Sequence, residues 1–186
     1  MLTLWDMLAP ADPAPRARAP RAGTPRSNAL ARYVAMERTM LDRYGVRVRK
    51  WRSSTTGVAW QVFYRDGTTK RLIESPRPRG PVSAAVFLHE IGHHAIGFSR
   101  YKPRCLEEYH AWRFSLEEMA SWELAITDRV RARVAESLQY AIDKAMRRGL
   151  REIPPEVAAC IAEQRRLLQP GDGAAGSFAD VGAAPG

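Results

Sequence analysis

One stretch of the chain, residues 81–97, reads PVSAAVFLHEIGHHAIG. Proline suits the first turn of a helix because it has no backbone N–H to leave unpaired, and glycine is common just past a helix end. With Pro81 at its start and Gly97 at its end, the stretch predicts a helix over 82–96. This helix carries all of the histidines of the chain except His110.

Within the predicted helix, residues 89–93 read HEIGH, which is an H-E-x-x-H motif. Side chains four positions apart share one face of a helix, so the imidazoles of His89 and His93 can converge on one metal ion. Glu90 then points sideways, toward a water on that ion. A zinc ion acting as Lewis acid beside a glutamate general base is the machinery that hydrolyses a peptide bond.

A catalytic zinc site normally has three protein ligands, so the two histidines need one more. Apolar residues recur at three- and four-residue steps after Pro103 and predict a second helix. The first two turns of that helix hold four candidate ligands, Cys105, Glu107, Glu108 and His110. At the start of a helix Glu107 is favoured as a solvated carboxylate rather than a ligand. A thiol or imidazole added as a fourth ligand would close the site, so a structural zinc ion remains an alternative.

Residues 108–115 of the second helix read EYHAWRFS. Together with the HExxH helix, this segment resembles the ImmA/IrrE-like zinc metallopeptidases, a zincin family of the gluzincin type often encoded on phages and mobile elements. In that family the motif is followed by a helix that reads roughly E-x-E-A-N-x-F-A. The chain matches the first Glu, the Ala and the Phe, and it departs from the pattern at His110, Trp112 and Ser115. An indole at position 112 offers only a hydrogen-bond donor in a slot where the family has a polar residue that can orient a ligand histidine.

The resemblance implies that Glu108 is the third ligand, completing a set of His89, His93 and Glu108 around Zn²⁺. It implies a zinc-dependent endopeptidase with Glu90 as the catalytic base. The substrate would be a protein or peptide, for example a transcriptional repressor of a mobile element. The competing hypothesis is a non-catalytic module in which four protein ligands close the zinc site and a basic face binds DNA or a protein partner.

The remaining patterns predict a small α+β domain that resembles a zincin. Ser27 is a candidate cap for an opening helix, and β-forming runs on either side of an Asp66-Gly67 turn predict a short antiparallel sheet of about three strands. After the HExxH helix and the ligand helix, Thr127 and Pro154-Pro155 begin two further helices that form a helical C-terminal extension.

Composition divides the chain into three parts. Residues 1–27 are rich in proline, alanine and arginine, and residues 169–186 are rich in glycine and alanine, so we predict a disordered arm and a disordered tail. The domain itself is expected over 28–168.

Charge and hydropathy limit the classes of function. The chain has 186 residues with 29 Lys+Arg against 20 Asp+Glu, which gives a net charge of +9 that could attract nucleic acid. No nucleic-acid-binding motif accompanies that charge. No apolar run is long enough to cross a membrane, and the first residues lack the pattern of a signal peptide, so we expect a cytoplasmic protein without a membrane segment.

Overall fold

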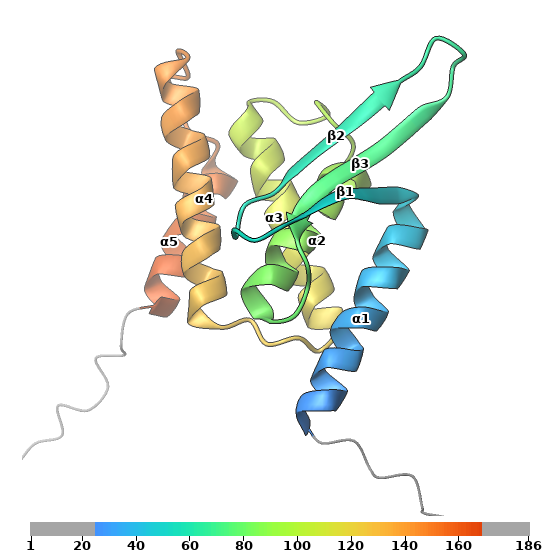
Figure 1. The fold of residues 1–186 in the computed structure, drawn as a ribbon. Coiled ribbons are helices and arrows are strands. Elements are labelled where there is room, and N and C mark those ends of the chain that lie inside the picture. Colours follow the sequence, from blue (N-terminus) through green and yellow to red (C-terminus); the bar gives the residue numbers. More distant parts are fainter. Residues whose placement is uncertain (1–24, 169–186) are drawn as a thin grey trace, which may run out of the picture.

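The computed structural model describes residues 25–168 (Figure 1). Within them the chain forms helices and strands in the order α1 Pro25–Tyr44, β1 Val46–Arg52, β2 Val58–Phe63, β3 Thr69–Pro76, α2 Pro81–Ile96, α3 Arg104–Ser121, α4 Asp128–Arg147 and α5 Pro155–Leu168. The predicted α+β class is therefore confirmed. The predicted tail over 169–186 and the predicted arm up to residue 24 lie outside the described residues. No helix within residues 25–168 is long and apolar enough to span a membrane.

The helices follow the signals in the sequence closely. The predicted helix over 82–96 begins one residue earlier, at Pro81, and ends at Ile96. Helix α1 begins at Pro25, two residues before the predicted cap, since the fixed φ of proline and its missing N–H suit the first turn. Thr127 occupies the N-cap position of α4, although its hydroxyl makes no capping hydrogen bond.

The sheet corrects one expectation. Its strand order is β1-β3-β2, with β2 antiparallel to β3 and β1 parallel to β3, so the sheet is mixed and the prediction of an antiparallel sheet was wrong. The hairpin between β2 and β3 turns at Asp66-Gly67 as predicted, with Gly67 at φ 83°. Alternation of β-forming residues carries no information on strand order. Strand β3 takes the centre because it holds the most buried residues of the sheet, among them Ile73 and Ser75.

Helix α2 lies in the middle of the domain, in contact with α3, with β3 of the sheet, and with α1 and α4 (Figure 1). Every residue from Ala84 to His94 is buried, as expected for a helix that is apolar on all sides apart from its histidines and Glu90. The close approach of α2 to α3 depends on Gly92. A Cβ at that position would lie 2.8 Å from the backbone oxygen of Ala111 on α3.

Helix α4 packs through an apolar stripe. Val130, Val134, Leu138 and Ile142 are buried, and they recur at the four-residue spacing of one helix face. The opposite side of α4 remains free of the core. A third face of α4, beside the buried stripe, borders the cavity described below.

Candidate metal centre

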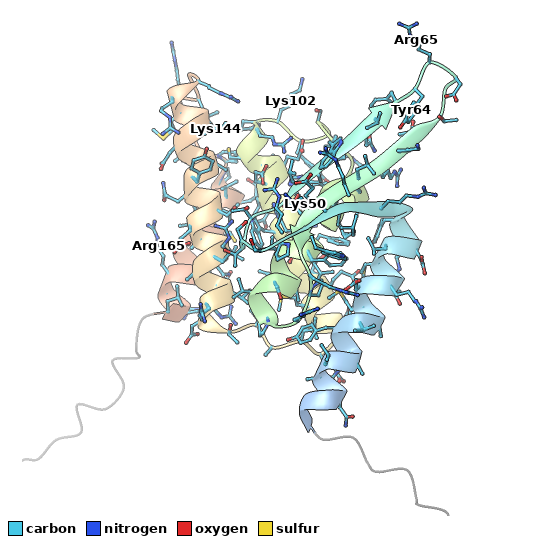
Figure 2. The ribbon with its side chains drawn as sticks, in the orientation of Figure 1. Lys50, Tyr64, Arg65, Lys102, Lys144 and Arg165 are labelled. Carbon is cyan, nitrogen blue, oxygen red and sulfur yellow. The ribbon has the colours of Figure 1, made fainter. Side chains whose placement is uncertain are left out.

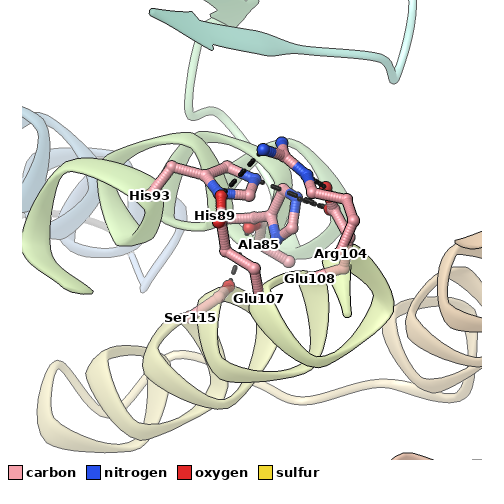
Figure 3. Close-up of polar contacts among 7 residues, drawn as sticks. All are labelled: Ala85, His89, His93, Arg104, Glu107, Glu108 and Ser115. Atoms are coloured by element: carbon pink, nitrogen blue, oxygen red, sulfur yellow. Dashed lines mark hydrogen bonds and ion pairs between the residues drawn. The ribbon is translucent and has the colours of Figure 1, made fainter. Parts of the chain in front are cut away.

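Two neighbouring helices bring the three predicted ligands together (Figure 3). His89 and His93 project from adjacent turns of α2, and Glu108 projects from the first turns of α3. Glu108 Oε2 lies 3.3 Å from His89 Nε2 and 3.5 Å from His93 Nε2. One ligand atom from each of the three residues lies within 4.8 Å of the other two, so the cluster could hold a metal ion.

The ring of His89 is held by stacking on Trp112. The two ring centroids are 4.2 Å apart and the planes are inclined by 23°. Trp112 is only 1% exposed, and its Nε1 has no hydrogen-bond partner. The family that the motifs resemble has a polar residue at this position. Here an aromatic face orients His89 instead, a contact that was not predicted because only the hydrogen-bonding capacity of the indole was considered.

Glu107 is buried, so the prediction of a solvated carboxylate was wrong. Its side chain is 1% exposed; Oε1 lies 3.6 Å from His93 Nδ1, and the backbone N–H of Ser99 donates to Oε2 at 2.7 Å. Arg104 Nη1 forms an ion pair with the same carboxylate at 2.8 Å. The reason is the face of α3: Glu107 and Ser115 are two turns apart on the side that packs against α2.

Ser115 shows how that packing is fixed. Its Oγ donates a hydrogen bond of 2.7 Å to the carbonyl of Ala85 on α2 (Figure 3). The serine that departs from the alanine of the family pattern thus links the ligand helix to the HExxH helix. Helices α2 and α3 are in close contact at this hydrogen bond and at Gly92. This packing places Glu107 and Glu108 beside His89 and His93.

The buried environment shifts the pKa values of the ligand residues in opposite directions. Burial lowers the pKa of His89 to about 4, which leaves a neutral imidazole, the form that binds a metal. Burial also acts to lower the pKa of His93, but the neighbouring carboxylates of Glu107 and Glu108 outweigh it and raise the pKa to about 9. Burial acts to raise the pKa of Glu108, and the two histidines together hold it far below its usual range.

Glu90 lies beside the cluster and is only 4% exposed. Burial raises its pKa to about 7, despite the opposing charge of His93. Gly57, in the connection between β1 and β2, faces this carboxylate so closely that a Cβ on the glycine would overlap Oε1 of Glu90. The sheet connection therefore confines the predicted base, and only glycine leaves it room.

A cavity of about 870 Å³ opens over the cluster. Its floor includes His89, Glu90, His93 and Glu108, and its walls are formed by the start of β2 on one side and by α4 on the other. The sequence analysis treated α4 only as part of the helical C-terminal extension and did not predict this wall. The signal was available in polar residues of α4 and its C-cap that recur at three- and four-residue spacing, namely Arg133, Ser137, Tyr140, Lys144 and Arg148.

Several other candidate residues do not reach the cavity. Tyr101, Tyr109 and His110, which could in chemical terms steady a developing oxyanion, do not line it; the ring of His110 stacks on Tyr101 with centroids 3.8 Å apart. Cys105, a candidate ligand from the sequence, is buried outside the cluster. His94 lies on another side of α2, where its Nε2 donates to the carbonyl of Leu72 at 3.1 Å.

Comparisons with known protein families, with curated proteins and with solved structures found no match to this chain. The resemblance to the ImmA/IrrE-like metallopeptidases stays a prediction from the motifs. Support for a function comes from the geometry of the cluster and its cavity.

Proposed function

We propose that this protein is a zinc-dependent endopeptidase with a zincin-like fold, related to the ImmA/IrrE-like metallopeptidases. Its ligands are His89, His93 and Glu108, and its general base is Glu90. The single observation that carries the proposal is the convergence of these three ligand atoms under a cavity that Glu90 also lines.

The spacing of the ligand atoms supports zinc as the metal. Zinc binds imidazole nitrogen and carboxylate oxygen at about 2.0–2.2 Å in tetrahedral geometry, which separates neighbouring ligand atoms by about 3.3–3.6 Å. The distances from Glu108 Oε2 to the Nε2 atoms of His89 and His93 are 3.3 and 3.5 Å. Two imidazoles and a carboxylate are also a donor set found in catalytic zinc sites.

The number of ligands favours catalysis over a structural role. Among the described histidines, cysteines and carboxylates, no fourth residue joins His89, His93 and Glu108 in the cluster. Cys105 and His110, the candidates for closing the site, lie outside it and do not line the cavity. A structural zinc site is normally closed by four protein ligands, so three ligands under a cavity support the catalytic interpretation.

Zinc, when bound, supplies a Lewis acid that makes water a stronger acid and polarises a carbonyl. The residues of the chain do the rest. Glu90 takes a proton onto its carboxylate and returns it to the leaving amine, and a pKa near 7 suits a group that must do both at neutral pH. Trp112 and Glu107 keep the two imidazoles in place by stacking and by a charged contact.

The cavity also suits an extended polypeptide. Strand β2 is at the edge of the sheet, with β3 as its pairing partner, and its first residues, Val58 and Ala59, line the cavity. An edge strand offers unpaired backbone groups to which a peptide can add as a further strand. A protein substrate, such as the repressor of a mobile element implied by the resemblance, would be held across the site in this way.

The test measures zinc content and peptide cleavage separately. His89→Ala and Glu108→Ala are expected to lose bound zinc, whereas Glu90→Gln keeps zinc and loses cleavage. Cleavage is followed by mass spectrometry on a proteome-derived peptide library. Glu136→Gln, an exposed carboxylate on α4 outside the cavity, is the matched control and should retain both properties.

Equal zinc in the parent, His89→Ala and Glu108→Ala would overturn the ligand assignment. A Glu90→Gln variant that cleaves as fast as the parent would show that Glu90 is not the base. A zinc-loaded parent that cleaves no peptide of the library would count against the peptidase and favour the non-catalytic module.

A further inference from the structure

The wall of the cavity formed by α4 carries an unusual set of side chains. Seven residues from this helix and its C-cap line the cavity, and they are Arg133, Ser137, Tyr140, Ala141, Lys144, Ala145 and Arg148. Their spacing of three and four residues places them on one face of the helix. Figure 2 marks Lys144 on the upper half of α4. We call this face the basic wall.

The positive charges of the basic wall have no acidic partners. Within residues 25–168, no carboxylate forms an ion pair with Arg133, Lys144 or Arg148. Arg133 Nε is buried without a hydrogen-bond partner, although the residue lines the cavity. A buried guanidinium nitrogen without a partner is costly, and it indicates that a ligand completes the arrangement.

The basic wall begins beside the metal centre. Arg133 lines the cavity together with His89 and Glu108 of the candidate metal centre. From Arg133 to Arg148 the helix extends over about 22 Å, at about 1.5 Å per residue. That length equals about six or seven residues of an extended peptide, at about 3.3 Å per residue.

The opposite wall of the cavity differs in chemistry. There β2 presents Val58 and Ala59, together with the unpaired backbone edge of an outer strand. The negative charges of the cavity are confined to its floor, at Glu90 and Glu108, and Arg104 at the rim already pairs with Glu108. An occupant is therefore offered backbone pairing on one side and three unpaired cations on the other.

We infer that the cavity selects acidic polypeptide segments, with the backbone of the segment along β2 and its carboxylates against Arg133, Lys144 and Arg148. The inference rests on the proposed function for cleavage, but it concerns binding and is tested by binding. A polypeptide is favoured over a nucleic acid because the β2 side of the cavity presents a strand edge and small apolar residues rather than further cations.

The experiment measures binding in the full chain with Glu90→Gln, so that no probe is cleaved. The probe is a short fluorescein-labelled, amidated peptide containing several glutamates, and its counterpart has each glutamate replaced by glutamine. Fluorescence anisotropy should show the acidic peptide bound more tightly, with an affinity that falls as salt rises. The same acidic peptide with a free C-terminus distinguishes side-chain carboxylates from a terminal carboxylate as the recognised group.

Two double variants identify the face that binds. Lys144→Gln with Arg148→Gln removes two cations of the basic wall and should weaken binding of the acidic peptide by about 3- to 30-fold, the effect of two exposed ion pairs. Arg129→Gln with Arg147→Gln removes the same charge from exposed positions of α4 outside the cavity and should leave binding within about twofold. All four substituted residues are exposed, so both double variants should fold.

The outcomes separate this inference from the proposed function. The selection of acidic segments is overturned if the acidic peptide and the glutamine peptide bind equally well. It is also overturned if both double variants lose the same binding affinity. Neither outcome contradicts the proposed peptidase activity. Tighter binding of a single-stranded DNA that depends on Lys144 and Arg148 overturns it in favour of a nucleic acid. Wall-dependent binding of the acidic peptide supports the inference even where the parent cleaves nothing, in which case the proposed peptidase fails alone.

Discussion

The imidazole of His89 lies almost flat on the indole of Trp112, with ring centroids 4.2 Å apart and planes inclined by 23°. The contact joins a residue of the HExxH helix to a residue one turn past Glu108 on α3. Stacking restricts rotation of the imidazole about its side-chain bonds, and this is the role that a hydrogen bond plays for many ligand histidines. The aromatic face therefore makes a testable contribution to metal affinity.

Trp112→Leu is expected to lower zinc affinity by about tenfold or more, as the loss of a contact that orients a ligand does. It should also reduce the free energy of unfolding by about 2–4 kcal/mol, because a large buried side chain is truncated. Trp112→Phe keeps an aromatic face and should retain most of the affinity. Competition with a chromophoric chelator measures zinc affinity and urea denaturation measures stability; equal affinity in the leucine and phenylalanine variants would contradict the stacking role.

Gly57→Ala tests the confinement of the base. A Cβ at position 57 would overlap the carboxylate of Glu90, and the flexible side chain of Glu90 would give way rather than the backbone. We expect cleavage to fall by about 10- to 100-fold, because small displacements of a catalytic group are costly, with zinc content unchanged. Gly80→Ala, where nothing lies within 4 Å of the added Cβ, is the control for a glycine substitution and should retain cleavage.

Gly92→Ala tests the close approach of α2 and α3. The added Cβ would lie 2.8 Å from the backbone oxygen of Ala111, and a backbone atom of a packed helix cannot move aside cheaply. Overpacking of this kind costs about 1–3 kcal/mol, while the better helix propensity of alanine returns about 1 kcal/mol. We expect a net loss of stability in urea together with weaker zinc binding, since the two ligand helices separate. An alanine variant with unchanged stability and zinc affinity would show that the contact is not limiting.

Removal of the metal distinguishes the two classes of site. The core around α2 is built from apolar residues such as Phe87, Leu88 and Ile91, all fully buried, and does not need an ion to form. After treatment with a chelator we expect the helical circular dichroism signal to persist and cleavage to be lost. Tm should fall, because metal binding no longer stabilises the native state. Complete unfolding on chelation, as in small zinc-stabilised domains, would instead indicate a structural zinc ion.

The sequence predicted the parts of this fold that depend on local chemistry. Pro81 and Gly97 bracket a helix because their backbone preferences act within a single turn, and the four-residue spacing of His89 and His93 guarantees a common face. Glu108 could be assigned from the resemblance, since spacing alone left Cys105 and other residues as alternatives. The structure then brings Glu108 to both histidines, whereas Glu107 contacts only His93, at Nδ1, and Cys105 and His110 lie outside the cluster.

The parts that the sequence did not predict depend on contacts between distant segments. The mixed sheet arises because β1 pairs with the far side of β3, a choice that strand patterns do not encode. Glu107 looks like a surface residue until α3 packs on α2 and covers it. The polar face of α4 is visible in the sequence as a three- and four-residue spacing, but only the structure shows that this face lines the cavity together with β2.

The metal ligands and the proposed base come from α2 and α3, whereas the three unpaired cations come from α4 and its C-cap, later in the chain. In the proposed function, chemistry and target choice are therefore assigned to different segments. On that proposal, exchange of the segment around α4 for one with another charge pattern would redirect the protein toward new targets without altering the reaction.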